Sequence, residues 1–328
     1  GHPDDDESFD FGARQTSTVV LGDAMVVANR ALVAAYNLSD GSPRWRQVLQ
    51  GDGNQQSWPL QPFHLAVAED RLLVRRLTEA GPELCCLSAA DGNVLWTAAL
   101  GGMAVSDAML GDRDAYVFQL RRSFSSRLSL ELVRIDVDSG YLLDTAPLIE
   151  LNDALGDRLI CQSRLLRDRI VATIGGCTLC CDLQGRLRWL RHAVWAPPRE
   201  PGAYYAQCYR QVHDVPLVKD DQLFAFQPGM FGVECLDLET GVLRWQRVLP
   251  GIERLVGVSD ARLVVATRDE LLALGPDGRV LWRHETPRRF ELFGCGAEAI
   301  VYARSERTDD AAGPRRPELV WLDAATGR

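Results

Sequence analysis

The stretch Cys86-Leu87-Ser88-Ala89-Ala90-Asp91-Gly92-Asn93-Val94-Leu95-Trp96 decides the fold, because versions of it return along the whole chain. Its first residues predict a short apolar strand, and the Asp-Gly pair supplies the backbone conformation that a tight turn requires. The residues that follow begin a return strand, which reaches a Trp at the fourth position after the Gly. The unit therefore predicts a β-hairpin whose indole ring covers a neighbouring hairpin.

Seven turn glycines occur in comparable settings, 37 to 56 residues apart: Gly41, Gly92, Gly140, Gly185, Gly241, Gly278 and Gly327. In five repeats the fourth residue after the glycine is a tryptophan: Trp45, Trp96, Trp189, Trp245 and Trp282. Asp144 stands at this position in the third repeat, and the sequence stops one residue after Gly327. We interpret the five tryptophans as structural docking residues, each buried against an adjacent unit.

A second element, a polar turn followed by an alternating apolar run, precedes each of these hairpins, as in Glu69-Asp70-Arg71-Leu72-Leu73-Val74. Each repeat therefore offers about four short strands, and helical periodicity is nearly absent. Because one such sheet cannot bury both faces alone, the repeats predict an all-β propeller of seven four-stranded blades. Eight blades are the alternative if residues 16–33 and the C-terminal region build an extra one. An open solenoid or a pair of sandwiches is the plainer alternative.

The pattern of Cys235 to Trp245, small-x-Asp-x-x-Thr-Gly-x-x-x-Trp, resembles the tryptophan-docking repeat of the pyrroloquinoline quinone (PQQ)-like β-propellers. The resemblance extends from about Thr18 to Arg328. This family includes the quinoprotein alcohol dehydrogenases and the propeller lipoprotein of the outer-membrane barrel-assembly machinery, and the chain resembles the lipoprotein more. The resemblance implies a bacterial protein of the periplasm or cell envelope. The missing third Trp predicts a looser third blade, and the seventh repeat lacks its closing strand.

Composition limits the domain organisation and the partners. Residues 1–15 read as a tag remnant and an acidic, mobile N-terminus, and residues 16–328 as a single propeller domain that is a fragment of a longer chain. The net charge of −9 and the pI near 5.2 argue against nucleic acid, which favours a basic surface. No apolar run approaches the roughly 20 residues of a membrane helix, so we expect no membrane insertion by this segment.

The sequence offers no catalytic, cofactor-binding or metal-binding constellation. The nine cysteines include the pair Cys85-Cys86 and the run Cys177-Thr178-Leu179-Cys180-Cys181. Three of them fall where the repeat requires a small residue, so we interpret them as structural thiols rather than metal or redox groups. The turn aspartates are explained by the repeat. None of the four histidines outside the first residues, at positions 64, 192, 213 and 284, lies beside a nucleophile signature.

The 56-residue interval after Gly185 contains a Pro-rich, aromatic stretch from Trp195 to Arg210. Long loops on rigid scaffolds often carry binding sites, and aromatic rings with Arg suit a protein interface. We predict a partner-binding loop formed by Trp195, Arg199, Tyr204, Tyr205, Tyr209 and Arg210. The alternative is a plug that packs its rings over the end of the propeller channel. A second stretch, residues 305–317, reads as a solvated hairpin tip.

The leading functional prediction is a non-enzymatic propeller scaffold that mediates protein–protein or interdomain interaction and needs no cofactor. One alternative, implied by the family resemblance, is a dehydrogenase that depends on PQQ and calcium. We cannot assign the calcium ligands or the base of that enzyme to any residue here, and the chain is short for it. Another alternative is a propeller that binds a small molecule or glycan in its axial channel.

Overall fold

The computed structural model describes residues 17–29, 32–49, 65–78, 80–122, 127–151, 161–174, 176–192, 215–227, 232–260, 262–286, 290–296, 298–306 and 316–328. These residues form 28 strands and no helix. Among them, consequently, no helix is long and apolar enough to cross a membrane. The chain divides into two compact units, Gly1–Ile170 with Cys181–Leu187, and Val171–Cys180 with Arg188–Arg328. We describe each unit by itself.

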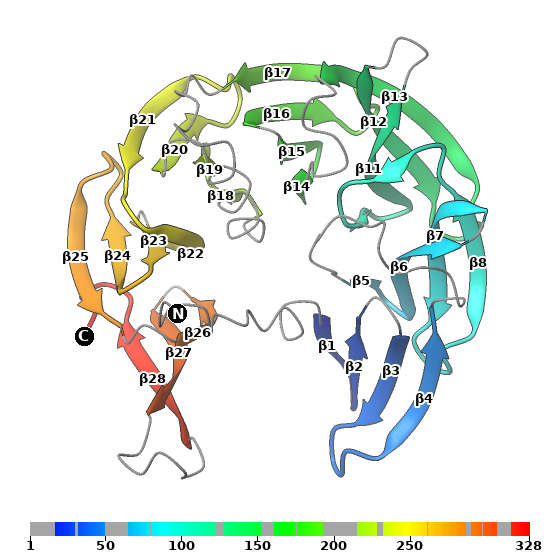
Figure 1. Cartoon of the computed structure of the whole chain (residues 1–328), viewed down its shortest axis with the longest axis horizontal. Coiled ribbons are helices and arrows are strands. Elements are labelled where there is room, and N and C mark those ends of the chain that lie inside the picture. Colours follow the sequence, from blue (N-terminus) through cyan, green and yellow to red (C-terminus); the bar gives the residue numbers. More distant parts are fainter. Residues whose placement is uncertain are drawn as a thin grey trace, which may run out of the picture. The chain divides into compact units, whose positions relative to one another are not determined.

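The first unit contains three complete sheets in which the strands lie side by side in chain order (Figure 1). The first comprises β1 (Ser17–Leu21), β2 (Ala24–Ala28), β3 (Leu32–Asn37) and β4 (Pro43–Val48). The second comprises β5 (Ala66–Ala68), β6 (Arg71–Thr78), β7 (Gly81–Ser88) and β8 (Val94–Ala99). The third comprises β10 (Met109–Leu110), β11 (Asp114–Arg122), β12 (Leu128–Asp136) and β13 (Leu142–Leu151), and β9 (Met103–Ala104) also pairs with β11.

The fourth sheet crosses the boundary between the units and comprises β14 (Cys161–Leu165), β15 (Arg169–Ile174), β16 (Cys177–Asp182) and β17 (Leu187–His192). In the second unit, the fifth sheet comprises β18 (Leu217–Lys219), β19 (Gln222–Gln227), β20 (Gly232–Asp237) and β21 (Leu243–Val248). The sixth comprises β22 (Ile252–Ser259), β23 (Arg262–Thr267), β24 (Glu270–Leu274) and β25 (Val280–Glu285). The seventh has three described strands, β26 (Phe290–Cys295), β27 (Ala299–Glu306) and β28 (Arg316–Asp323).

In five sheets the predicted hairpin joins the third and fourth strands, and a bulge interrupts the pairing directly beside the docking position. In the fifth sheet Cys235 pairs with Trp245, and the register shifts between Cys235 and Leu236. Comparable shifts follow Ala35, Cys86, Arg134 and Ala273. The bulge turns the strand that carries the Trp. The side chain opposite the Trp is Ala or Cys because a larger one would compete with the ring for space.

The core lies between consecutive sheets. Side chains of the first and second sheets, including Val26, Val33 and Leu72, form one buried cluster, and Leu73, Val117 and Val133 belong to a second one between the second and third sheets. Corresponding clusters join the fifth sheet to the sixth and the sixth to the seventh. Central strands are buried on both faces, whereas the outer strands alternate between exposed and half-buried residues. This pattern is typical of sheets that stack face to face.

The third sheet differs from the predicted blade. It has a fifth short strand, and β11 to β13 are the longest strands of the first unit, with 9, 9 and 10 residues. The predicted number of blades, seven or eight, stays a prediction, because the structure describes seven sheets of which the last has three strands.

Candidate functional site

The five predicted docking tryptophans lie on the outer strands and reach the turn of the next sheet. In four of them the indole Nε1–H donates to a turn carbonyl: Trp45 to Ala89 (3.0 Å), Trp96 to Val137 (2.8 Å), Trp189 to Leu238 (3.1 Å) and Trp282 to Ala324 (3.1 Å). The acceptor is always the residue three positions before the turn glycine. Each of these turns therefore meets an indole in the same way.

The turn glycine lies directly on the indole ring. A Cβ built on Gly241, whose φ is +70°, would come within 2.6 Å of the Trp189 ring. The corresponding distance at Gly140, above Trp96, is also 2.6 Å, and at Gly327, above Trp282, it is again 2.6 Å. Glycine is therefore required at these positions for two reasons: the backbone is left-handed, and the indole ring leaves no room for a Cβ.

Most of each of the five docking tryptophans is buried, and a part of each side chain stays exposed. The physical reason is the narrowness of the turn. It covers one face of the ring around the glycine, and the outer edge of the indole stays in solvent because the ring belongs to the outermost strand of its sheet.

Trp245 departs from this pattern. Its ring lies under Gly278 and beside Phe224, with ring centroids 6.0 Å apart, but its buried Nε1 has no hydrogen-bond partner among the described residues. The turn above it closes with a bond from the Gly278 N–H to the Gly275 carbonyl, and is therefore one residue shorter than the turn in which the Gly241 N–H bonds the Asp237 carbonyl. We attribute the missing acceptor to this shorter turn.

In the third repeat the position of the Trp is taken by Asp144, which lies opposite Arg134 where β13 pairs with β12, and is exposed. The next turn, Asp182 to Gly185, is again a short one, closed by a bond from the Gly185 N–H to the Asp182 carbonyl. It rests on Ala146, and a Cβ on Gly185 would collide with the Ala146 side chain. The turn therefore lies directly on Ala146 of β13, where no indole ring separates them.

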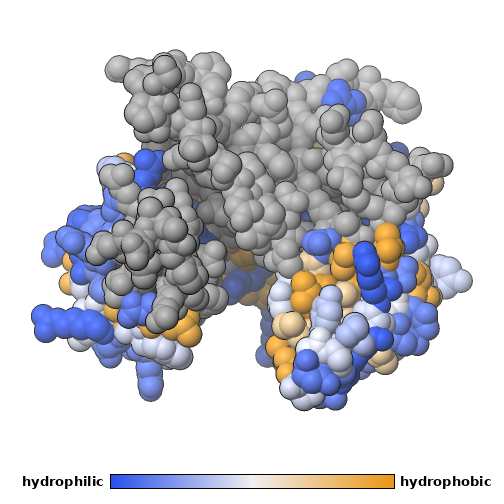
Figure 2. Space-filling view, turned by 60° about the horizontal axis from the view of Figure 1, so that its bottom comes forward, coloured by the Kyte–Doolittle hydropathy of each residue, from blue (hydrophilic) through white to orange (hydrophobic). Residues whose placement is uncertain are grey.

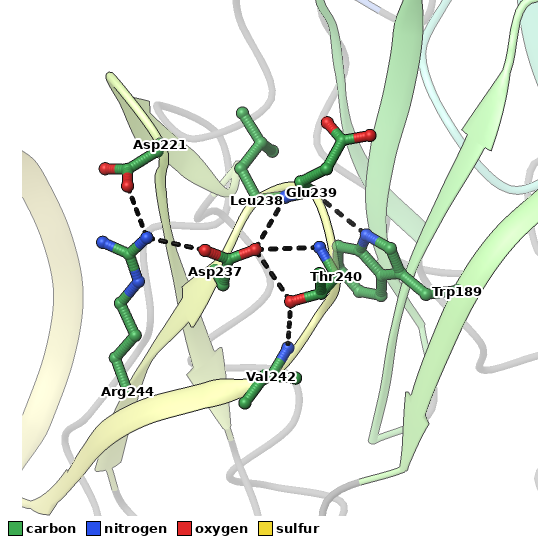
Figure 3. A network of polar contacts seen from close by, with 8 residues as sticks. All are labelled: Trp189, Asp221, Asp237, Leu238, Glu239, Thr240, Val242 and Arg244. Carbon is green, nitrogen blue, oxygen red and sulfur yellow. Dashed lines mark hydrogen bonds and ion pairs between the residues drawn. The ribbon is translucent and has the colours of Figure 1, made fainter.

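Within each turn an aspartate holds the backbone. Asp237 Oδ1 accepts hydrogen bonds from the Glu239 and Thr240 amides and from the Thr240 hydroxyl, and Asp237 Oδ2 accepts one from Arg244 at 2.6 Å (Figure 3). Arg244 also donates to Asp221, at the turn before β19. Arg44 makes corresponding bonds to Asn37 and Asp23 in the first sheet. These charges therefore stabilise the turns.

Acid should weaken this turn. The Arg244 hydrogen bond, followed by those from Thr240, lowers the pKa of Asp237 to about 2, against about 3.9 in an unfolded chain. A depressed carboxyl pKa stabilises the fold above the unfolded value, and this contribution is lost as the pH falls from about 4 towards 2. We expect Asp237→Asn to destabilise the protein at pH 5, and the difference from the parent to shrink steadily towards pH 2.5.

Urea denaturation midpoints of both proteins across this pH range measure the effect. Because Asp237→Asn leaves all the other turn aspartates in place, the difference between the two curves isolates Asp237. A difference that stays constant from pH 5 to 2.5 would show that the ionised carboxylate does not hold the turn.

The described cysteines are almost all buried. Seven of the eight described thiols are buried, and Cys295 is half-buried. Burial raises the pKa of Cys86 to about 12 and that of Cys235 to about 11, so neither thiol forms a reactive thiolate near neutral pH. Cys208 lies outside the described residues.

The described residues bring together no group of three or more His, Cys, Asp or Glu side chains that could hold a metal ion. His284, one of the predicted isolated histidines, bridges two sheets: its Nδ1 lies 3.0 Å from the Gly327 carbonyl oxygen and its Nε2 3.1 Å from the Tyr302 hydroxyl. The predicted partner-binding loop, Trp195 to Arg210, lies outside the described residues.

Apolar side chains reach the surface in several patches between polar ones (Figure 2). Among the large apolar side chains of the described residues, the largest exposed fractions belong to Tyr141 (74%), directly before the outer strand β13, and to Trp321 (67%) on β28. Tyr141 is followed by Leu142 (56%) and Leu143 (44%), so three consecutive large apolar residues are exposed. Sequence reasoning missed this surface, although part of the signal was present: the residue before the docking position is Arg in the first, fourth and fifth repeats and Leu in the second, third and sixth.

The described residues form mostly four-stranded antiparallel sheets, and indole rings pack against the turns of the following sheets. This arrangement is typical of β-propellers. The chain matches the model of the family described as outer membrane protein assembly factor BamB over residues 8–224 and 229–328. It belongs to this family of PQQ-like propellers. The predicted resemblance is therefore confirmed. A comparison with curated protein sequences finds no match.

Solved structures show the same fold at low identity. BamB from Moraxella catarrhalis aligns with a TM-score of 0.61 and 14% identity, over 88% of this chain and 80% of that one. Sqt1 from Saccharomyces cerevisiae aligns with a TM-score of 0.60 and 9% identity, over 94% and 80%. Quinohemoprotein alcohol dehydrogenase from Comamonas testosteroni aligns with a TM-score of 0.55 and 10% identity, over 88% and 62%. These likenesses support the propeller fold and carry no assignment of function.

Proposed function

We propose that the protein is a non-enzymatic propeller scaffold that binds another protein in the bacterial cell envelope. The observation that carries this proposal is the exposed run Tyr141, Leu142 and Leu143. The buried thiols and the turn carboxylates, by contrast, contribute to the fold itself. Apolar side chains that gather at a surface are typical of sites that another protein covers. The family description, which names outer membrane protein assembly, supports both the kind of partner and the envelope localisation.

The opposing function is a PQQ-dependent dehydrogenase, favoured by the likeness to a quinohemoprotein alcohol dehydrogenase. The two functions are separated by adding PQQ and calcium, removing unbound cofactor on a desalting column, and measuring both the cofactor absorption and dye-linked oxidation of alcohols. The scaffold function predicts that no cofactor stays bound and no alcohol is oxidised. Retained cofactor with turnover would overturn it.

Binding itself is tested by cross-linking the tagged chain in living bacterial cells and identifying the adducts by mass spectrometry. A scaffold predicts one or a few envelope proteins, captured reproducibly. The predicted loop enters as the variant Tyr204→Ser/Tyr205→Ser, which should lose the captured protein with little change in melting temperature. Loss of stability with capture intact would instead indicate a plug for the channel. If the parent chain captures no protein under any condition, the scaffold function is wrong.

A further inference from the structure

The outer strand of each sheet is exposed to pairing with foreign strands, and this chain protects most of its outer strands with arginine. An unpaired strand presents a row of backbone N–H and C=O groups, and charged side chains, above all basic ones, prevent unwanted pairing. The outer strands β4, β17, β21 and β25 carry such residues: Arg44, Arg46, Arg188, Arg244, Arg247 and Arg283. An outer strand without basic residues is therefore a candidate for pairing with a strand of another protein.

The start of β13 has no such protection. Leu142-Leu143-Asp144-Thr145-Ala146 contains no basic residue, and among the described strands β13 pairs with β12 on one side only. The segment begins directly after the turn at Gly140. It ends at Pro147, which lacks the N–H that strand pairing needs. An open edge of five residues, Leu142 to Ala146, therefore lies between two natural stops, with a bulge at Leu143 where the register shifts.

The side chains around this edge are apolar. The turn glycine Gly140 lies on the Trp96 ring of β8, so the start of β13 and the exposed residues Val94 and Leu95 adjoin this contact. β8 itself has no charged residue. Tyr141, Leu142 and Leu143 beside the open edge, and Val94 and Leu95 beside Trp96 in the chain, are all exposed and uncharged.

One unbalanced charge lies within the segment. The exposed carboxylate of Asp144 accepts a hydrogen bond from the neighbouring Thr145 amide at 2.8 Å, and no ion pair joins it to Arg134, the residue opposite it on β12, or to another described basic residue. Further along β13, Glu150 is already paired with Arg127 at 2.8 Å. A strand that paired with this edge would therefore gain from a Lys or Arg opposite Asp144 and from apolar side chains beside Leu142 and Leu143.

We propose that Leu142 to Ala146 is a strand-addition site, which pairs with an extended segment of a partner protein in which apolar and basic side chains alternate. In this mode the backbone bonds of the added strand supply affinity, and the side chains supply specificity. The proposal rests on the scaffold function and names the surface and the partner chemistry for it.

The chain offers a matched pair of variants. Leu143→Arg restores the arginine that the first, fourth and fifth repeats carry directly before the docking position, and Leu143 is 44% exposed, so the fold should tolerate the change. Leu281→Arg makes the same change at the same repeat position on β25, at 52% exposure, where Arg283 already protects the strand. The two proteins should have the same melting temperature as the parent.

The probe is a fluorescently labelled hexapeptide that alternates valine and lysine, titrated to millimolar protein and followed by anisotropy. We expect saturable binding to the parent and to Leu281→Arg, and at least tenfold weaker binding to Leu143→Arg. Asp144→Asn should weaken binding of the lysine peptide. A peptide with glutamate in place of lysine, and one N-methylated at every amide, should bind at least tenfold more weakly to the parent.

Equal binding of the probe to the parent and Leu143→Arg, equal binding of the N-methylated peptide, or no binding at all would overturn the proposal. A parent chain that dimerises in sedimentation, with the dimer lost in Leu143→Arg, would assign the edge to a second copy instead. If Leu143→Arg still cross-links to the same cellular protein as the parent, the scaffold function stands and the β13 site is wrong. If the peptide binds as expected but the parent captures no protein in cells, the scaffold function fails by itself.

Discussion

Replacing Trp189 with alanine is expected to lower the free energy of unfolding by about 3 kcal/mol. Truncation of a buried Trp typically costs about 3 to 5 kcal/mol, and the half-buried position of this ring places it at the lower end. The change removes the surface on which Gly241 rests and the hydrogen bond from the indole to the Leu238 carbonyl. Denaturant midpoints of the parent and variant measure the loss.

A comparison with phenylalanine separates the two contributions. Trp189→Phe keeps a ring under Gly241 but leaves the Leu238 carbonyl without its donor, which should cost about 1 kcal/mol beyond the loss of ring area. Trp245→Phe should lack this extra cost, because the Trp245 Nε1 has no acceptor among the described residues. Equal effects of the two phenylalanine variants would show that the indole hydrogen bonds do not contribute.

The second large effect is expected at a buried ion pair between the fourth and fifth sheets. Arg191 on β17 contacts both carboxylate oxygens of Glu234 on β20, at 2.9 and 3.2 Å. The side-chain amide nitrogen of Gln227 donates hydrogen bonds to both Glu234 and Thr178. The hydrogen bonds to the Glu234 carboxylate raise the pKa of Arg191, and Glu234 is fully buried.

Arg191→Met should therefore cost about 3 to 5 kcal/mol, because it leaves the Glu234 charge buried without a partner. The double variant Arg191→Met/Glu234→Met should recover most of this loss, since a pair of apolar side chains of similar length leaves no unpaired charge. Unfolding free energies of the four members of this cycle provide the test. A double variant less stable than Arg191→Met would contradict the assignment of the cost to an unpaired carboxylate.

The repeated chemistry of the chain made most of the fold predictable. A turn glycine followed at the fourth position by Trp is a local signal, because the left-handed glycine and the reach of the indole are both set within one hairpin. The structure places all five docking tryptophans against the next turn. Register explains the small residues opposite them, such as Cys235 beside Trp245.

What escaped prediction depends on contacts between distant parts of the sequence. Arg191 and Glu234 are 43 residues apart, and nothing in either strand indicates that they meet. The closure of the turn around Gly185 onto Ala146 could not be predicted either, because the third repeat merely lacks a Trp in the sequence. The open edge of β13 was readable in principle from Leu143, once the arginines at the same repeat position were recognised as protection.

Alanine substitution at two matched glycines tests most directly whether indole docking holds the sheets together. Gly41 and Gly241 close five-residue turns at the same φ of +70°, but a Cβ on Gly41 meets nothing within 4 Å, whereas one on Gly241 would lie 2.6 Å from the Trp189 ring. Gly41→Ala should cost only the left-handed backbone penalty of about 1 to 2 kcal/mol. Gly241→Ala should cost about 1 to 3 kcal/mol more, because the ring must be displaced, and the excess should disappear in a Trp189→Ala background. Equal losses for Gly41→Ala and Gly241→Ala would contradict the docking of each sheet onto the next through its tryptophan.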